Sequence, residues 1–120
     1  MRRMSTDADV HALLPLPPAT FHILLALSTG DRHGYGIMQD VEARTRGELR
    51  LSAGTLYRTI QRLLEQGLIE ERPQRSPIVD ARRRTYRITP FGTAAVRADA
   101  ERLAELVLMA KGAGLLLRLP

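Results

Sequence analysis

The stretch LSAGTLYR at residues 51–58 contains the clearest helix start in the chain. Ser52 is a strong N-cap residue, since its hydroxyl oxygen can accept a hydrogen bond from an otherwise unpaired amide of the first turn. Leu51 before it and Leu56 after it stand at the two positions that form a hydrophobic staple. Apolar residues then recur with helical spacing, and a glycine follows as a stop signal. We therefore predict a helix over residues 52–66 with one buried face, formed by Leu56, Ile60, Leu63 and Leu64.

Two strand-like runs follow this helix, at residues 68–72 and 85–89. Tyr86 and Ile88 would share one face of the second run, with Tyr86 in the core. Prolines interrupt the connection, which is a loop of roughly ten residues and longer than the usual hairpin turn. The loop ends in three consecutive arginines, Arg82, Arg83 and Arg84. A helix followed by a ribbon with a basic tip is typical of a winged helix-turn-helix protein, a class that binds duplex DNA.

The chain upstream predicts two more helices. A pair of prolines at 17–18 can open the first, which is apolar nearly all round and therefore belongs inside the core. The second is expected over residues 34–46, with Gly47 as its C-terminal cap. Residues 48–51 alternate between polar and apolar side chains, which indicates one short strand.

The last predicted helix has Thr89 as its N-cap, opens with Pro90 and runs to about Lys111. Its apolar residues follow a heptad pattern, which favours pairing with a second copy of the chain. The alternative is that Leu103, Leu106 and Val107 fold back on their own chain. A head of three helices and a small ribbon leaves little surface for that, so we expect a dimer interface at Val96, Ala100, Leu103, Leu106, Val107 and Ala110.

The expected fold is therefore mainly α with a small β-ribbon, a winged helix-turn-helix followed by a C-terminal dimerisation helix. Residues 1–16 would form a mobile lead-in, residues 17–89 the winged-helix domain, and residues 90–120 the dimerisation helix with an apolar tail. A length of 120 residues is enough for one such domain but not comfortably for two.

Composition excludes several function classes. The chain has no cysteine, which rules out a disulfide scaffold, a thiolate metal site and a cysteine nucleophile. His11, His22 and His33 are evenly spaced, but eleven helical residues rise about 16 Å, too far for one metal ion. No motif of an enzyme or a cofactor site is present, so we expect no catalysis, metal or cofactor. Without a recognisable signal or membrane segment, a cytoplasmic location is expected.

The net charge of +5 has an informative position. Residues 72–87 contain six arginines and a single aspartate, so this segment alone equals the charge of the whole chain. Such a patch suggests a polyanionic partner, nucleic acid first. The plainer interpretation is an arginine-rich composition whose charges are merely solvated.

The predicted helix 52–66 would enter the major groove, which is about 12 Å wide and admits one helix. Arg58 and Arg62 are the candidates for bidentate contact with guanine, although a solvated surface or an ion pair of Arg62 with Glu65 would also explain them. Three hydroxyl groups on this helix suit phosphate oxygens, those of Ser52, Thr55 and Tyr57.

Arg82, Arg83 and Arg84, at the basic tip, would clamp the DNA backbone or enter the minor groove. Tyr35 lies between two glycines, and its ring is expected to pack beside helix 52–66. A hydrogen bond from its hydroxyl group to a phosphate is the alternative role for Tyr35.

The ordered set of motifs resembles the PadR-like family of transcriptional regulators. The matching pieces are ILLAL at 23–27, RHGYGI at 32–37, LSAGTLY at 51–57, LLEQGLI at 63–69 and RRTYRITPFG at 83–92. Together they span about residues 20–95 in family order.

The chain departs from the family pattern at two positions. The family usually has proline at the position of Ala53, and often has it at the position of Arg58. Arg58 thus adds a charge on or beside the presumed DNA face. The short C-terminal part is similar to the compact branch of the family. The resemblance also implies that a small, often aromatic or phenolic molecule could release the DNA through the dimer interface, although no aromatic clamp is evident in this sequence.

These observations favour a sequence-specific, homodimeric transcriptional regulator, expected to be a repressor that acts at a palindromic promoter site. The alternative hypothesis is a protein-interaction module that keeps the winged-helix shape without reading DNA.

Overall fold

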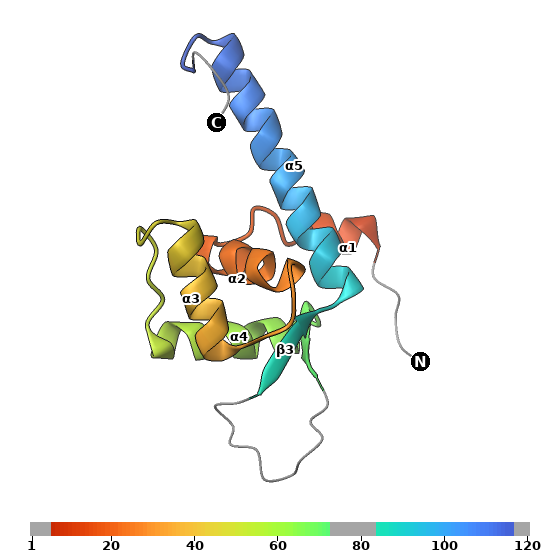
Figure 1. Ribbon diagram of the computed structural model, residues 1–120. Coiled ribbons are helices and arrows are strands. Elements are labelled where there is room, and N and C mark those ends of the chain that lie inside the picture. Colours follow the sequence, from red (N-terminus) through yellow and green to blue (C-terminus); the bar gives the residue numbers. More distant parts are fainter. Residues whose placement is uncertain (1–5, 73–83, 117–120) are drawn as a thin grey trace.

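The computed structural model of the protein describes residues 6–72 and 84–116 (Figure 1). Its elements, in chain order, are α1 (Asp7–His11), α2 (Pro18–Ser28), β1 (Arg32–His33), α3 (Gly34–Arg44), α4 (Ala53–Glu65), β2 (Ile69–Glu71), β3 (Thr85–Ile88) and α5 (Pro90–Gly112). Helices therefore dominate, beside one small sheet, as the sequence predicts. None of the helices within the described ranges is both long and apolar enough to cross a membrane.

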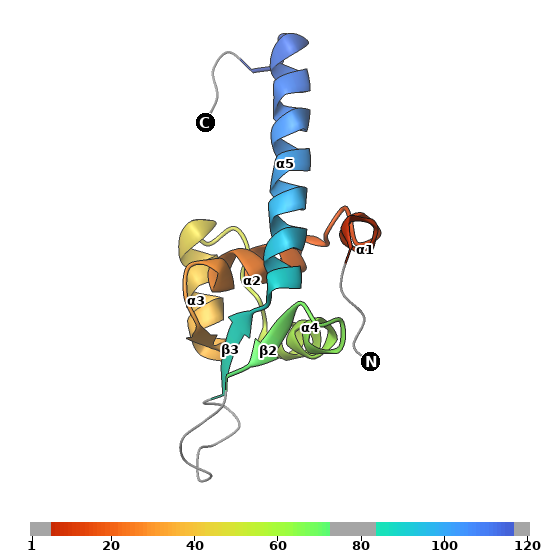
Figure 2. The same ribbon diagram turned by 90° about the vertical axis from the view of Figure 1, so that its right-hand side faces the viewer.

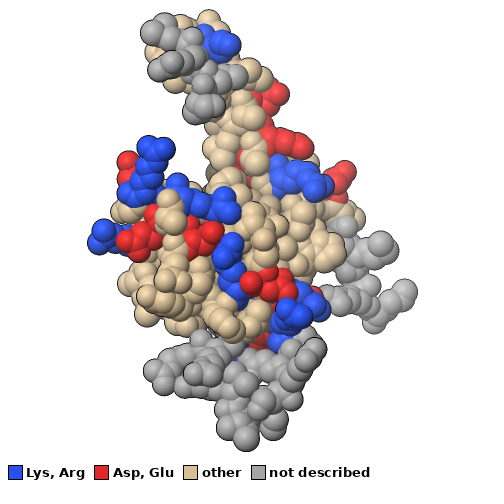
Figure 3. Space-filling view, viewed as in Figure 1, with Lys and Arg blue, Asp and Glu red and all other residues tan. Residues whose placement is uncertain are grey.

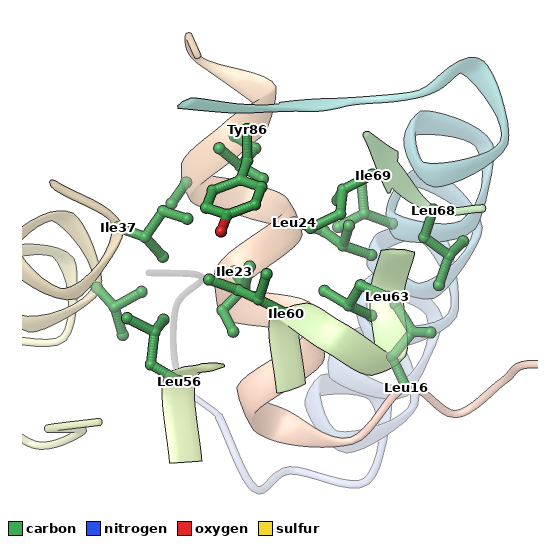
Figure 4. Packing of buried hydrophobic residues seen from close by; sticks show 14 of the residues in the cluster. Leu16, Ile23, Leu24, Ile37, Leu56, Ile60, Leu63, Leu68, Ile69 and Tyr86 are labelled. Carbon is green, nitrogen blue, oxygen red and sulfur yellow. The ribbon is translucent and has the colours of Figure 1, made fainter. Parts of the chain in front are cut away.

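The core forms around α2, which contacts α3, α4, α5 and β3. Ile23, Leu24 and Leu27 on this helix are almost completely buried, as expected for a helix that is apolar nearly all round. The buried stripe of α4 packs against them through Leu56 and Ile60 (Figure 4). The other members of the same cluster are Leu16, Ala26, Ile37, Val41, Leu51, Leu63, Leu68, Ile69, Tyr86, Ala95 and Val96.

The sheet has the strand order β1-β3-β2, and both pairings are antiparallel. Arg32 faces Tyr86, and Glu70 faces Arg87 in the other ladder. The side chain of Tyr86 is buried, which confirms its predicted place in the core.

Hydrogen bonds at the helix ends explain where α4 and α5 begin. The Ser52 side chain accepts a hydrogen bond from the Thr55 amide at 3.1 Å, which confirms it as the N-cap of α4. Thr89 caps α5 in the same way, accepting from the Gly92 amide at 3.0 Å. The Thr89 hydroxyl also donates to the Gly67 carbonyl at 2.7 Å, so one side chain joins the start of α5 to the end of α4.

Two predictions from the sequence need correction. Residues 48–51 form no strand; they belong to the loop between α3 and α4, where Leu51 is buried. The third strand is instead β1, a two-residue run too short for a periodicity argument to detect. In addition, the expected mobile lead-in contains a helix after residue 5. This helix, α1, is capped at its N-terminus by a capping box between Thr6 and Asp9, and it packs against α5.

Helix α5 starts on the core and then projects away from it, as both views show (Figures 1 and 2). Its buried residues are all in the first half of the helix: Gly92, Ala95, Val96 and Asp99. Asp99 receives a hydrogen bond from Arg102 at 2.8 Å, which pairs its charge at the point where the helix leaves the body.

Candidate nucleic-acid interface

The exposed side of α4 lies opposite the side that packs in the core. Ser52, Arg58 and Arg62 are exposed, whereas Leu56 and Ile60 are buried. The Ser52 hydroxyl donates to the Thr55 hydroxyl oxygen at 3.0 Å, so these two predicted phosphate contacts lie side by side at the helix N-terminus. Both remain predictions as DNA contacts, and the amides of the first turn add donors there.

The two arginines of α4 have no carboxylate partner within the described part of the chain. Glu65, the alternative partner considered for Arg62, accepts a hydrogen bond from the Gln61 amide at 3.3 Å instead. Arg58 extends back along the helix towards Gly54, leaving its charge in solvent. Both guanidinium groups are therefore available to an external anion.

Tyr57 is only partly available to a ligand. Its side chain is 38% exposed, and its ring lies directly against Gly34, the first residue of α3. The contact joins α4 to the start of the preceding helix. Tyr57 therefore has a packing role that the sequence did not indicate, beside its predicted role as a phosphate contact.

The expected packing of Tyr35 is wrong. Its side chain is 66% exposed, because the contact with α4 is made by Gly34 and the ring of Tyr57 instead. The alternative role for Tyr35, a phosphate contact, stays a prediction.

The ribbon carries three described arginines, which we call the wing arginines: Arg72, Arg84 and Arg87. Each is in an ion pair. Arg84 lies 3.2 Å from Glu71, Arg87 lies 2.6 Å from Glu70, and Arg72 lies 3.4 Å from Asp31. Arg82 and Arg83 fall outside the described residues, so their predicted contacts with the DNA backbone stay predictions.

Because the wing arginines are paired, the described residues of the ribbon do not form the free basic patch that the sequence suggests. Within residues 6–72 and 84–116, twelve Arg and Lys side chains stand against twelve Asp and Glu side chains. Since the two numbers cancel, the net charge of +5 comes entirely from the remaining residues of the sequence. Figure 3 shows the result as blue and red side chains lying next to one another over the face that carries the sheet.

An ion-pair network holds the frame around the interface. Arg32 donates to the Ala26 carbonyl at 2.9 Å, and its guanidinium group lies 3.3 Å from Asp40. Asp40 also pairs with Arg44 at 2.7 Å. The network connects the end of α2, β1 and α3, and it fixes the helix that precedes α4. No motif in the sequence pointed to it, because its members are spread over separate elements.

The outer half of α5 exposes the apolar residues that the heptad pattern predicts at a dimer interface. Leu103 and Leu106 are 38% and 47% exposed, so they do not fold back on their own chain. Leu108 and Met109 are more exposed still. Val96 is an exception among the predicted interface residues, because it is buried in the core of its own chain. Among the others, Ala100 is exposed, and Val107 and Ala110 are half-buried.

The described residues offer no cluster of three or more histidine, aspartate or glutamate side chains that could hold a metal ion. The geometry is that of a winged helix-turn-helix protein: a helix with an exposed polar face, a ribbon beside it, and a long helix that leads away from both.

The chain belongs to the PadR-like family of transcriptional regulators, whose profile matches residues 23–98. It is 40% identical over 86 residues to the transcriptional regulator Rv3488 of Mycobacterium tuberculosis (strain ATCC 25618 / H37Rv), an alignment that covers 71% of this chain and 75% of that relative. As a member of this family, the protein is a transcriptional regulator and not an enzyme.

Solved structures share the fold. A PadR family transcription regulator from hypervirulent Clostridium difficile R20291 superposes with a TM-score of 0.65 at 22% identity, covering 80% of this chain and 97% of that one. A PadR-like transcriptional regulator (BC4206) from Bacillus cereus strain ATCC 14579 gives 0.64 at 18% identity, covering 89% and 96%. The mainly helical architecture with a three-stranded sheet and a long C-terminal helix is therefore that of PadR-like winged-helix structures.

Proposed function

We propose that the protein is a sequence-specific DNA-binding repressor that acts as a homodimer at a palindromic promoter site. The observation that carries this proposal is the exposed face of α4, where Arg58 and Arg62 are without a carboxylate partner among the described residues. Bidentate contact of arginine with guanine is the commonest specific contact in the major groove. A regulator of this kind must reach the chromosome, so we propose a cytoplasmic location.

The dimer is supported by the outer half of α5. Exposed leucines on a helix that leaves the body are costly in water, and a second copy of the same helix would cover them. Two-fold pairing presents two copies of α4, which fits half-sites about one helical turn of DNA apart, on the order of 34–36 Å. Occupancy of such a site would block a promoter, and a small molecule bound at the dimer interface could release it.

The experiment is a titration of the purified protein into a fluorescently labelled fragment of its own upstream DNA, with a random duplex of equal length beside it. We expect tighter binding to the upstream fragment, at one dimer per site. If no promoter-proximal fragment binds even at low salt, the proposal fails.

One observation favours the alternative of an interaction module that does not read DNA. The described body is electrically neutral, and its wing arginines are paired with carboxylates. A module of this kind would show almost no salt dependence with duplex DNA, and would instead retain a protein partner in a pull-down experiment.

A further inference from the structure

The three wing arginines share one arrangement, although their partners come from different elements. Arg84 and Arg87 pair with glutamates of the neighbouring strand β2, whereas Arg72 reaches across to Asp31, next to β1. Since β3 lies between β1 and β2, the carboxylates flank it on both sides. Each wing arginine is thus matched by a carboxylate on, or next to, another strand of the sheet.

These ion pairs are open to solvent. The Arg84 and Glu71 side chains are 52% and 43% exposed, and the other two pairs are exposed to a similar degree. Exposed pairs contribute little to stability and exchange partners easily, because water screens them. A phosphate can therefore replace the carboxylate without unfolding the ribbon.

The position of the pairs decides which anion would compete. Strand β2 follows α4 directly and packs against it, so its glutamates lie beside the helix that we propose enters the groove. In Figure 1 the ribbon extends to the same end of the molecule as α4, away from α5. DNA lying along α4 would bring its backbone close to the wing arginines.

We propose that Glu70, Glu71 and Asp31 compete with DNA phosphates for the wing arginines and so set a sequence-independent limit on DNA affinity. The inference rests on the proposed function, since it needs DNA on the α4 side. An arginine held by a carboxylate cannot neutralise a phosphate until the ion pair opens. The cost of opening the pair weakens binding to every duplex equally. Specificity would remain with α4.

The test compares Glu71→Gln with a matched control, Glu101→Gln. Both substitutions remove one negative charge, but Glu101 lies exposed on α5 and has no ion-pair partner in the described residues. Binding is measured by fluorescence anisotropy with the upstream fragment and a random duplex, from about 50 to about 200 mM salt. Glu71→Gln is also made in an Arg84→Ala background, which lacks the arginine that Glu71 restrains, and is compared there with Arg84→Ala alone.

We expect Glu71→Gln to bind both duplexes about two- to tenfold more tightly than the wild type. Its log–log salt slope should steepen by about 0.9 for each arginine released, hence by about 1.8 for a dimer. Glu101→Gln should follow the wild type, and in the Arg84→Ala background Glu71→Gln should bind no more tightly than Arg84→Ala alone. Thermal unfolding of the variants confirms that they are folded.

Two outcomes would overturn the inference alone. One is that the wild type binds DNA and Glu71→Gln behaves like Glu101→Gln. The other is that Glu71→Gln tightens binding as much in the Arg84→Ala background as in the wild type, which would make the gain a general effect of net charge. If no variant binds either duplex, the proposed function fails, and the competition with phosphates fails together with it.

Discussion

The hydroxyl oxygen of Tyr57 lies 2.7 Å from the point that a Cβ atom on Gly34 would occupy. Two ring carbons of Tyr57 lie at 3.0 and 3.1 Å from the same point. Real Cβ atoms do not approach other atoms so closely, so any larger residue at position 34 would push the Tyr57 ring away from the start of α3.

We expect Gly34→Ala to lower the free energy of unfolding by about 1 kcal/mol, the low end of the range for overpacking, because the end of the exposed Tyr57 ring can shift. The loss should occur although alanine is the better helix former. Urea denaturation measures it. Gly36→Ala is the matched control, since its nearest neighbour is an Arg32 carbon at 3.6 Å, and it should be neutral or slightly stabilising. Equal losses from both substitutions would contradict the contact. In a Tyr57→Leu background the cost of Gly34→Ala should shrink.

A second glycine allows α5 to start where it does. A Cβ on Gly92 would overlap the carbonyl oxygen of Leu68, at the point where the Thr89 amide donates to that same oxygen at 3.1 Å. Backbone atoms cannot rotate away as a side chain can. We therefore expect Gly92→Ala to cost more than Gly34→Ala, about 3 kcal/mol or above, in the same denaturation experiment. Gly112→Ala, with no atom within 4 Å among the described residues, should be tolerated; similar unfolding midpoints for both would refute the close approach.

The sequence was sufficient to predict the elements that are signalled locally. Capping residues and a periodic apolar stripe mark α4 over its whole length, and Thr89 with Pro90 marks the start of α5. These signals act within one or two helical turns, which is why they are visible in a single chain. The family motifs are also short stretches of neighbouring residues, so they too are visible in a single chain and pointed to the fold.

Features made by contacts across the chain could not be predicted in this way. The packing of Tyr57 on Gly34 joins residues far apart in sequence, and Tyr35 was the more conspicuous candidate for it. The wing arginines looked like free charge because their partners are not neighbours in sequence. Asp31, which pairs with Arg72, lies forty-one residues away, and Glu70 and Glu71 come close to Arg87 and Arg84 only through the pairing of β2 with β3. Only the three-dimensional arrangement shows that these positive charges are matched.

The buried ring of Tyr86 predicts a specific loss of stability in alkali. Burial raises the pKa of its hydroxyl group above the ordinary value of 10.0; the Glu71 carboxylate raises this pKa too, and Arg84 opposes the change. The unfolded chain therefore releases this proton at a lower pH than the folded protein does. The stabilisation is complete below about pH 10 and is lost as the pH rises towards the folded-state pKa.

We expect the stability of the wild type to fall above about pH 10, and that of Tyr86→Phe to fall less steeply over the same interval. Thermal unfolding followed by circular dichroism at a series of pH values measures the difference. Tyr35→Phe is the control, because that side chain is largely exposed, and it should reproduce the wild-type profile. Parallel profiles for all three proteins would argue against a stabilising role of the buried hydroxyl.

Substitution of Arg58 should reduce discrimination between DNA sequences. If its guanidinium group contacts a guanine, Arg58→Ala should weaken binding to the upstream fragment by about 1–3 kcal/mol more than binding to random DNA. Arg83→Ala, in the wing, should weaken both equally, as a phosphate contact does. Arg97→Ala on α5 serves as the charge control. The assignment fails if the Arg58 and Arg83 variants lose the same affinity on both duplexes.

The outer half of α5 provides the last prediction, because its apolar residues have no cover within the described chain. Leu106→Glu would place a charge in the proposed interface between two copies, which is strongly unfavourable when the charge is unpaired. We expect this variant to be monomeric by light scattering and to bind its operator at least about a hundredfold more weakly, since both half-sites are no longer bound together. Glu105→Gln changes the neighbouring residue without adding charge and should stay dimeric. Leu106 is 47% exposed, so a single chain has room for the new side chain and should still fold. A Leu106→Glu variant that remains a dimer would therefore mean that the two copies meet through another surface.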